Sequence, residues 1–458
     1  MSTFPSTPEE FYALRDDRTN RCVTSGDYQR IGCAVYLASN QAATADGQTM
    51  LLVAANLLSR WCRRVTIALP STVAHPELGS GDLGRLVLAQ MQDADPFGEF
   101  QVVDIESAAL SDVALCIGGR PPRASSGTTV FISASGWLAG LSYQQPLVMP
   151  MSHQANRLGA VAAACLGVGQ IFKIALGMRA ELGLREGTFD LSRLEWSNEP
   201  SLGWPKSTDI GKVLMVGAGS VGSAVAYCAR VAGLRGSIDI LDRDTIKVEN
   251  FNRSPIFGHA TFGLTKASAV ARFLGESKLW ATPIEEWWKE FTERKGRLSV
   301  DYDVWLPLAN EFNVRHAMQQ WVPPLMIHAS TGVNWGVNHG RHVPGRDDCL
   351  VDRFPAEVSA AQLACSTAQV SIANVPVDAA LPFASVFAGV LITADLVRAL
   401  LPDYPQAPNF ALFDLYGPLD VILKSNRKPR LGCVCLDQGR AFHDRFNAAT
   451  KYRSSFGF

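Results

Sequence analysis

Apolar residues in the first part of the chain fall into short continuous runs separated by longer amphipathic stretches. Residues 65–69, 112–118 and 128–135 are apolar runs of strand length, and each predicts a buried strand. Residues 49–60 repeat apolar positions at helical spacing and residues 156–178 are rich in Ala and Gly, so both predict helices. Strands that alternate with helices are typical of an α/β fold, in which helices cover both faces of a parallel sheet.

The second part of the chain repeats this alternation with sharper boundaries. The pattern predicts a strand at residues 212–216, a turn at 217–222, a helix at 223–233 and a strand at 237–242. The further elements that it predicts are strands at 303–308, 325–329, 409–415 and 419–424 and a helix at 383–401. A glycine-rich loop follows the first strand here but not in the first part, which we therefore predict to be a nucleotide-type fold without a nucleotide.

A polar segment separates the two parts. Residues 189–210 lack periodicity and contain Pro200 and Pro205. This composition is typical of a linker, so we predict a first domain at residues 1–188 and a second at residues 211–458.

Two pairs of similar segments suggest that the domains are copies of one another. DVALCIGG at 112–119 parallels DVWLPLAN at 303–310, and VFISASGWLAG at 130–140 parallels MIHASTGVNWG at 326–336. Short similarities between strands and loops also arise by chance. An internal duplication and a chance match therefore both stay open.

Charge and composition exclude several classes of protein. The 458 residues include 42 Lys+Arg and 43 Asp+Glu, and 47% of them are hydrophobic. The chain is too apolar to be disordered, and it lacks the basic excess that neutralises nucleic-acid phosphates. Its first residues do not resemble a secretory signal, and no uninterrupted apolar stretch predicts a membrane span. Several of the ten cysteines lie in apolar runs, so we expect a reducing, cytoplasmic location and neither nucleic acid nor membrane as a partner.

Three glycines lie between the first strand and the first helix of the second domain. Gly217, Gly219 and Gly222 have the spacing G-x-G-x-x-G. The first permits a tight turn, the second lets backbone N–H groups approach a phosphate, and the third allows the helix to pack closely. Asp242 ends the next strand, where a carboxylate can accept hydrogen bonds from a ribose hydroxyl. This arrangement fits NAD, FAD or ATP, and the alternative is a set of glycines that serves helix packing alone.

The polar residues after Asp242 favour a triphosphate over a redox dinucleotide. Asp244, Asn250, Arg253 and Lys266 follow it in the sequence. A nicotinamide nucleotide binds its diphosphate mainly through the glycine loop. A triphosphate has more charge to neutralise, for which Arg253 can bind phosphate oxygens bidentately and Lys266 can act as a point charge. The alternative is that both cations are ordinary solvated surface residues.

The ordered set D-x-D-T-x-x-x-x-N-x-N-R, followed by G-x-x-K, resembles the ATP site of the ubiquitin-activating family. That family includes the ThiF-like adenylyltransferases of the thiamine and molybdopterin pathways, and the resemblance covers about residues 210–435. It implies a Rossmann-like adenylation domain that uses ATP and Mg²⁺ to adenylate the C-terminal glycine of a ubiquitin-like protein. It implies that the three glycines contact phosphates and that Asp242 contacts the ribose, with Asp244 in the same cofactor site. It also implies contacts with phosphate or the reacting carboxylate from Asn250, Arg253 and Lys266.

The chain departs from the family where an Asp-Asn pair usually precedes a helix and an Arg, with the Asp near Mg²⁺. Counted back from Arg315, Asn310 takes the Asp position and Glu311 the Asn position; aligned on Asn310 instead, Ala309 takes the acid position. In both alignments the acid is out of its usual place. We include Asn310 and Glu311 in the cofactor site. The Glu311 carboxylate could supply the oxygen ligand that Mg²⁺ prefers, and how Mg²⁺ is bound stays open.

Members of the family often hold zinc with two CxxC pairs. The corresponding positions here read Cys349-Leu-Val-Asp352 and Cys433-Val-Cys435. Three sulfurs and one carboxylate could bind zinc, but the C-x-C spacing is poor for a tetrahedral site. A structural zinc ion is therefore the less favoured interpretation, and we expect ordinary thiols and assign no metal ligand.

Cys365 is the residue that we predict to react covalently. It lies in the stretch of about residues 340–380, which by resemblance is the crossover loop that carries the thiol of these enzymes. A thiolate that attacks an acyl-adenylate holds the acyl group as a transferable thioester. Cys349 is the rival, and a packed bystander is the third interpretation. His339 and His342 lie in a predicted loop and are expected to be surface residues.

The predicted protein is thus a single-chain pseudo-dimer of an inactive and an active adenylation half. It resembles the activating component of bacterial ubiquitin-like conjugation systems, some of them linked to antiviral (phage) defence. The resemblance implies two partners, a ubiquitin-like protein that ends in glycine and a conjugating enzyme that receives it from Cys365. Three alternatives stay open: an adenylyltransferase for a sulfur carrier or peptide without a thioester, an NAD- or FAD-dependent oxidoreductase, and a non-catalytic binding scaffold.

Overall fold

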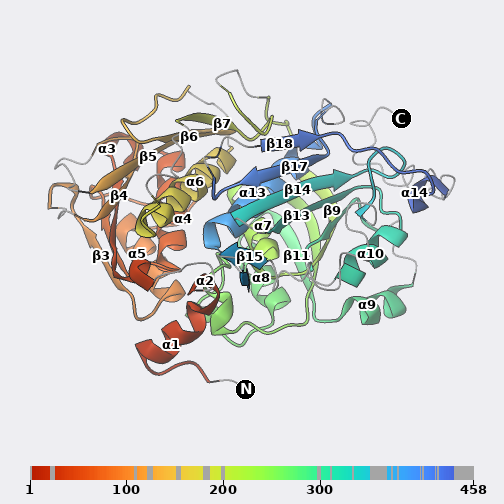
Figure 1. Ribbon diagram of the computed structural model, residues 1–458, viewed down its shortest axis with the longest axis horizontal. Coiled ribbons are helices and arrows are strands. Elements are labelled where there is room, and N and C mark those ends of the chain that lie inside the picture. Colours follow the sequence, from red (N-terminus) through yellow and green to blue (C-terminus); the bar gives the residue numbers. More distant parts are fainter. Residues whose placement is uncertain are drawn as a thin grey trace.

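The computed structural model describes residues 3–437 with several internal gaps. The residues outside the description are 1–2, 21–25, 108–110, 121–126, 151–155, 179–185, 198–201, 297–300, 310–311, 333–334, 351–368, 373–374, 379–380, 403, 405–406, 418, 420–421 and 438–458. In Figure 1 the first half of the chain lies on the left and the second half on the right, each built around its own sheet.

The first half holds one sheet and its helices. The strands are β1 (Gly32–Leu37), β2 (Arg64–Ala68), β3 (Glu99–Val103), β4 (Val113–Ile117), β5 (Thr128–Ser135), β6 (Leu138–Ser142), β7 (Gly187–Asp190) and β8 (Glu195–Trp196). The α-helices are α1 (Pro8–Arg15), α2 (Asp17–Asn20), α3 (Ser39–Ala42), α4 (Ala45–Ser59), α5 (Leu83–Ala94) and α6 (Leu158–Ala175). Short 3-10 helices lie at η1 (Gly26–Arg30) and η2 (Ile105–Ser107).

The second half has its own sheet and a separate strand pair. The strands are β9 (Asp209–Val216), β10 (Arg235–Leu241), β11 (Leu279–Ile284), β12 (Val304–Pro307), β13 (Met326–Thr331), β14 (Gly336–His342), β15 (Gln369–Ile372), β16 (Val375–Asp378), β17 (Phe410–Asp414) and β18 (Ile422–Ser425). The helices are α7 (Ser220–Val231), η4 (Val248–Asn250), η5 (His259–Thr261), α8 (Lys266–Leu274), α9 (Trp288–Lys295), α10 (Phe312–Gln320), α13 (Pro382–Arg398) and α14 (Val434–Asp437).

The two eight-stranded sheets have the same strand order. Their orders are β3-β2-β1-β4-β5-β6-β7-β8 and β11-β10-β9-β12-β13-β14-β17-β18. In both, the strands up to β5 or β13 pair in parallel, and the last three junctions are antiparallel. The segments that are similar in sequence take equivalent places, β4 with β12 and β5 with β13. The predicted Rossmann-like α/β fold in two halves is therefore confirmed.

Side-chain caps decide where several of the helices begin. Thr44 accepts a hydrogen bond from the backbone of the first turn of α4, Asp82 does the same for α5, and Thr265 for α8. Such caps satisfy N–H groups that the helix itself leaves unpaired. The cap at Thr265 also fixes the position of Lys266, the first residue of α8.

Four helices between the sheets form the core of the molecule. α4 packs on α6, α6 on α13, and α13 on α7, and their apolar side chains belong to one continuous cluster (Figure 1). Among the described residues α6 is the single helix long and apolar enough to cross a membrane, but all of its 18 residues are buried inside the protein. This burial is typical of a core helix.

Two regions differ from the sequence-based expectations. The expected linker at 189–210 contains the end of β7 and all of β8, which extend the first sheet. His339 and His342 were expected at the surface, but both are buried on β14, which pairs with a strand on each side. Buried polar partners permit this, because the His339 ring lies 3.1 Å from the Asp395 carboxylate and His342 contacts the carbonyl oxygen of Asp348.

Candidate functional site

The glycine loop joins the end of β9 to the start of α7. Gly217 has a φ of +101°, and a Cβ there would lie 2.5 Å from the backbone nitrogen of Ala309. A Cβ on Gly222 would lie 2.2 Å from the carbonyl oxygen of Gly217, so Gly222 allows close packing of the helix on the loop. A Cβ on Gly219 would meet nothing within 4 Å. The space beside Gly219 is therefore open to a ligand that approaches the start of α7.

Asp242 connects the end of β10 to the glycine loop. One carboxylate oxygen accepts a hydrogen bond of 2.7 Å from the backbone N–H of Ala218, and the other accepts one of 2.9 Å from Asp244. Burial raises the pKa of Asp242, and the charge of Lys266 opposes that rise. The Asp242 carboxylate, which we predicted to contact ribose, thus fixes the backbone of the glycine loop.

Lys266 and Asp244 form an ion pair beside this loop. The Nζ of Lys266 lies 2.6 Å from the Asp244 carboxylate, and the backbone N–H of Lys266 donates to the Asp244 carbonyl at 2.8 Å. The Lys266 side chain is 13% exposed, whereas that of Asp244 is 53% exposed. An anion that enters the site would compete with Asp244 for the lysine.

Asn250 and Arg253 lie on the turn that follows β10. The Asn250 side chain accepts a hydrogen bond of 2.9 Å from the backbone N–H of Lys247, which fixes η4. The Arg253 guanidinium donates to the carbonyl of Glu249 and, at 3.0 Å, to the side-chain oxygen of Asn252. Local hydrogen bonds therefore orient both residues before any ligand is bound.

One cavity of about 1230 Å³ brings these residues together. Of the predicted cofactor residues, those that line it are Gly217, Gly219, Asp242, Asp244, Asn250, Arg253 and Lys266. Gly222 does not line it and lies beneath the loop. Asn310 and Glu311, which we predicted near Mg²⁺, lie outside the described residues, and so does Cys365.

The first half contributes Asp17 and Arg18 of α2 to the same cavity. The sequence analysis missed both, because nothing in the sequence connects them to a loop about two hundred positions further on. It also missed three tryptophans that line the cavity, Trp287, Trp288 and Trp321. The cavity therefore has cations, an open glycine loop and aromatic side chains, which are features suited to the phosphates and base of a nucleotide.

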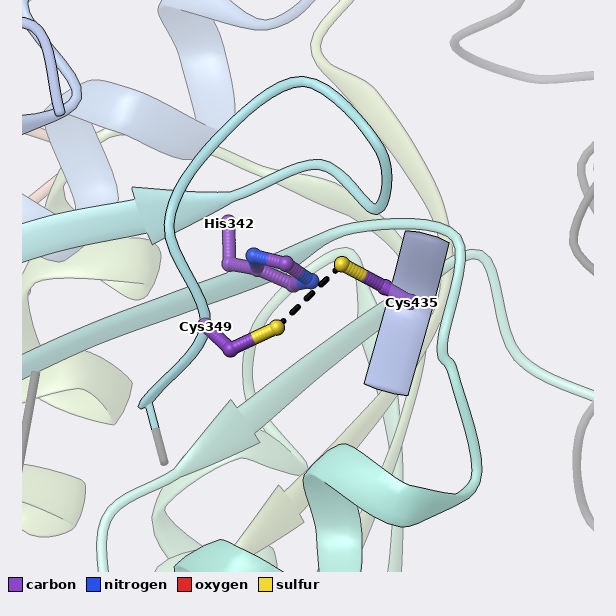
Figure 2. A group of neighbouring side chains, drawn as sticks. All are labelled: His342, Cys349 and Cys435. Carbon is purple, nitrogen blue, oxygen red and sulfur yellow. Dashed lines mark hydrogen bonds between the residues drawn. The ribbon is translucent and has the colours of Figure 1, made fainter. Parts of the chain in front are cut away.

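Another cluster of side chains lies where β14 ends (Figure 2). His342 comes from the end of β14, Cys349 from the loop that follows, and Cys435 from α14, and one ligand atom of each lies within 4.8 Å of the others. The Sγ of Cys435 lies 3.2 Å from that of Cys349 and 3.0 Å from that of Cys433. All four side chains are buried. Asp352, the carboxylate considered from the sequence, lies outside the described residues.

The donor atoms of this cluster are of the types that bind zinc. Three sulfurs and one imidazole form a ligand set typical of structural zinc. The thiol of Cys349, which hydrogen-bonds to Cys435, lowers the pKa of Cys435 to about 5 and favours the thiolate that a metal needs. The Nδ1 of His342 lies 2.9 Å from the Asp348 carbonyl, which can only accept, so Nδ1 carries the proton. The Nε2 lone pair accepts a hydrogen bond of 2.9 Å from the Gln319 amide, which a metal ion would have to displace. The sequence analysis had considered Asp352, and not this histidine, as the fourth ligand; its expectation of ordinary thiols stays a prediction.

Comparison with families of known proteins divides the chain in the same way as the fold. The model of the ThiF family matches residues 206–431, and that of the BilD N-terminal domain matches residues 32–191. The second sheet and the cavity thus lie mainly within the residues that match the ThiF family. Most of the first sheet lies within the residues that match the BilD N-terminal domain.

Among curated proteins, an uncharacterized protein of Sinorhizobium fredii, y4jF, is 24% identical over 302 residues, which cover 63% of this chain and 54% of that protein. The NEDD8-activating enzyme E1 catalytic subunit of Dictyostelium discoideum is 38% identical over 63 residues, 14% of either chain. The corresponding subunit of Caenorhabditis elegans is 36% identical over 63 residues, again 14% of either chain. The chain thus spans about half of the first relative and a small part of the others.

Among solved structures, Escherichia coli MccB with ATP has a TM-score of 0.37 at 18% identity, covering 49% of this chain and 66% of MccB. MccB with MccA-N7isoASN has a TM-score of 0.38 at 18% identity, covering 49% of this chain and 67% of MccB.

Proposed function

Residues 206–431 form a ThiF family domain, and from this premise we propose that the protein adenylates the C-terminal glycine of a ubiquitin-like partner. The local similarity to NEDD8-activating catalytic subunits supports this class of substrate. The observation that carries the proposal is the cavity in which the glycine loop meets Arg253 and Lys266, with Arg18 contributed by the other half. An active half and an inactive half would then cooperate within one chain as a pseudo-dimer.

In the proposed first step, an oxygen of the partner's terminal carboxylate attacks the α-phosphorus of ATP. The bond from that phosphorus to the bridging oxygen breaks, and pyrophosphate leaves with the electron pair. Arg253 and Lys266 offset the negative charge that builds on the departing phosphates. Lys266 gives up its ion pair with Asp244 and binds the phosphates instead. Bound Mg²⁺ would neutralise part of the same charge.

Support for the proposed second step comes from the sequence alone, because Cys365 lies outside the described residues. The thiolate of Cys365 attacks the carbonyl carbon of the acyl-adenylate, AMP leaves, and a conjugating enzyme takes the acyl group from the resulting thioester. A cytoplasmic location and a role in an antiviral conjugation system are proposals of the same kind.

We also propose that His342, Cys349, Cys433 and Cys435 hold a structural zinc ion. The ligand atoms of His342, Cys349 and Cys435 lie within 4.8 Å of one another, and the Cys433 thiol lies 3.0 Å from that of Cys435. A metal ion there would tie α14 to the end of β14 and thus to the start of the region that contains Cys365.

ATP–pyrophosphate exchange in the presence of candidate ubiquitin-like proteins that end in glycine tests the proposal. We expect exchange with the wild-type protein and its loss in Arg253→Ala, because the departing phosphates lose a cation. Arg272→Ala is the matched control, since Arg272 is exposed on α8 and does not line the cavity. Exchange that survives unchanged in Arg253→Ala would rule out this role for the residue.

The same assay separates the alternatives. A thioester predicts a partner adduct that a reducing agent releases and that Cys365→Ala lacks. Exchange without such an adduct would favour an adenylyltransferase for a sulfur carrier or peptide. Binding of NAD or FAD in place of ATP would favour an oxidoreductase, and a protein that binds no nucleotide would be a scaffold.

A further inference from the structure

The turn that carries Arg253 packs against residues of the first half of the chain. Residues 251–257, here called the phosphate turn, follow η4 directly. Phe251 and Phe257 are fully buried, and the Phe251 ring packs against the ring of Phe11 of α1 with centroids 6.2 Å apart. Asn252 donates to the hydroxyl of Thr19 of α2 at 3.3 Å. The first half thus surrounds a segment that belongs to the nucleotide site of the second.

Arg60, at the end of α4, makes the most extensive polar contacts with this turn. Its guanidinium donates to the carbonyl oxygen of Phe251 at 2.5 Å, to that of Phe257 at 3.0 Å and to that of Pro255 at 2.8 Å. Its Nε donates to the side chain of Asn56 at 2.7 Å, and the Asn56 amide donates to the same Pro255 carbonyl at 2.9 Å. Two side chains one helical turn apart therefore hold three carbonyls of the phosphate turn.

Burying the guanidinium of Arg60 costs desolvation free energy, which argues that its contact with the phosphate turn has a function. The side chain is 2% exposed, and the hydrogen bonds above all go to neutral oxygens. Burial lowers the pKa of Arg60 to about 9, and the carboxylate of Asp93 only partly opposes this. The C-terminal end of α4 contributes some stabilisation to a cation. A buried apolar residue would fill the same space without this cost in desolvation.

We propose that Arg60 and Asn56 are positioning residues of the nucleotide site, which hold the phosphate turn so that Arg253 faces the bound phosphates. Arg253 lies two residues from Phe251 and two from Pro255, so fixing both carbonyls fixes the backbone on either side of it. The inference rests on the proposed function, because it assumes that Arg253 contacts phosphate. It gives the first half, which has no glycine loop after β1, a defined task in binding ATP.

The test compares the affinities for ATP and AMP in Arg60→Met, which keeps the bulk of the side chain and removes its donors. We expect ATP to bind about tenfold more weakly, the scale of one lost charge-assisted hydrogen bond, while the affinity for AMP stays close to that of the wild type. Asn56→Ala should shift the ratio of affinities in the same direction by a smaller factor and is the milder variant if Arg60→Met folds poorly. Tryptophan fluorescence and calorimetry can measure both affinities.

Lys173→Met is the matched control. Lys173 is also a fully buried cation of the first half that donates to a carbonyl of the second, that of Gly417 at 2.8 Å, but it does not line the cavity. A merely structural role would lower the unfolding temperature of both variants and leave the ratio of ATP to AMP affinity unchanged. An unchanged ratio in Arg60→Met, or an equal change in Lys173→Met, would overturn the inference. A wild-type protein that does not prefer ATP would instead overturn the proposed function.

Discussion

At the scale of the residue, the three glycines of the loop meet different constraints. Gly217 and Gly222 are required by the fold, because a Cβ on either would overlap backbone atoms. Gly219 is not, since a Cβ there would point into open space. A phosphate that approaches from the cavity would give this position a use for glycine, which the sequence motif could not distinguish from a packing requirement.

Alanine substitution separates these roles. We expect Gly219→Ala to change the free energy of unfolding by no more than about 1 kcal/mol, but to weaken ATP binding clearly, because the methyl group occupies the space of a phosphate. Gly222→Ala should lower the free energy of unfolding by about 2 kcal/mol or more, because the Gly217 carbonyl has to move. Thermal unfolding and ATP titration of both variants give the comparison, and equal ATP affinity in Gly219→Ala and wild type would contradict it.

At the scale of the element, β14 is the strand whose role the sequence concealed. Its sequence GVNHGRH is polar and resembles a loop, yet it is buried between β13 and β17. Polar partners from several elements lie beside its side chains: the Arg341 guanidinium donates to the carbonyl of Ala407 at 2.9 Å, and the His339 ring lies 3.1 Å from the carboxylate of Asp395 of α13. The end of this strand supplies the histidine of the candidate zinc site.

Metal analysis checks the zinc proposal. We expect about one zinc ion per chain in the purified protein, and a loss of that zinc in both His342→Ala and Cys435→Ser, because a structural site needs four ligands. Removal of the metal by a chelator should lower the unfolding temperature, since α14 then loses its link to β14. Cys116→Ser, a buried cysteine of the other half, is the control that should keep its zinc. A zinc-free wild-type protein with free thiols would refute the site.

At the scale of the whole molecule, the two halves share one core. α6 of the first half packs on α13 of the second, and polar contacts cross the same boundary. The indole N–H of Trp196 donates to the Leu419 carbonyl at 3.0 Å, and Lys424 lies 2.8 Å from the Glu195 carboxylate. Neither half can therefore leave the other without exposing the apolar faces of its central helices.

Separating the halves should reveal this dependence. We expect residues 206–458 alone to lose cooperative thermal unfolding and to bind a hydrophobic dye, because α7 and α13 lose the cover of the first half. Co-expression with residues 1–205 should restore a single transition. A sharp transition of the isolated second half at the temperature of the full chain would contradict a shared core.

Some features of the fold and site could be predicted because they depend on local order in the sequence. Apolar runs predicted β5 and α7, and the motif from Gly217 to Lys266 predicted which residues share one site; the structure lines one cavity with most of them. The contribution of Arg18 could not be predicted, since no local pattern reports which distant helix packs against a loop. The resemblance did bring Cys349 and Cys435 together, but it offered Asp352 as the fourth ligand, because no local pattern reports that His342 lies beside these thiols.

The sequence alone therefore determined the alternation of strands and helices and the identity of the phosphate loop, because hydrophobic periodicity and glycine spacing act over a few residues. Only the tertiary structure decided that Arg60 hydrogen-bonds to the phosphate turn, that Arg18 lines the cavity and that His342 lies beside the thiols of Cys349 and Cys435. Each of these contacts depends on how the two sheets and the helices between them pack. Packing brings together residues that are far apart along the chain, and no local sequence pattern reports such contacts.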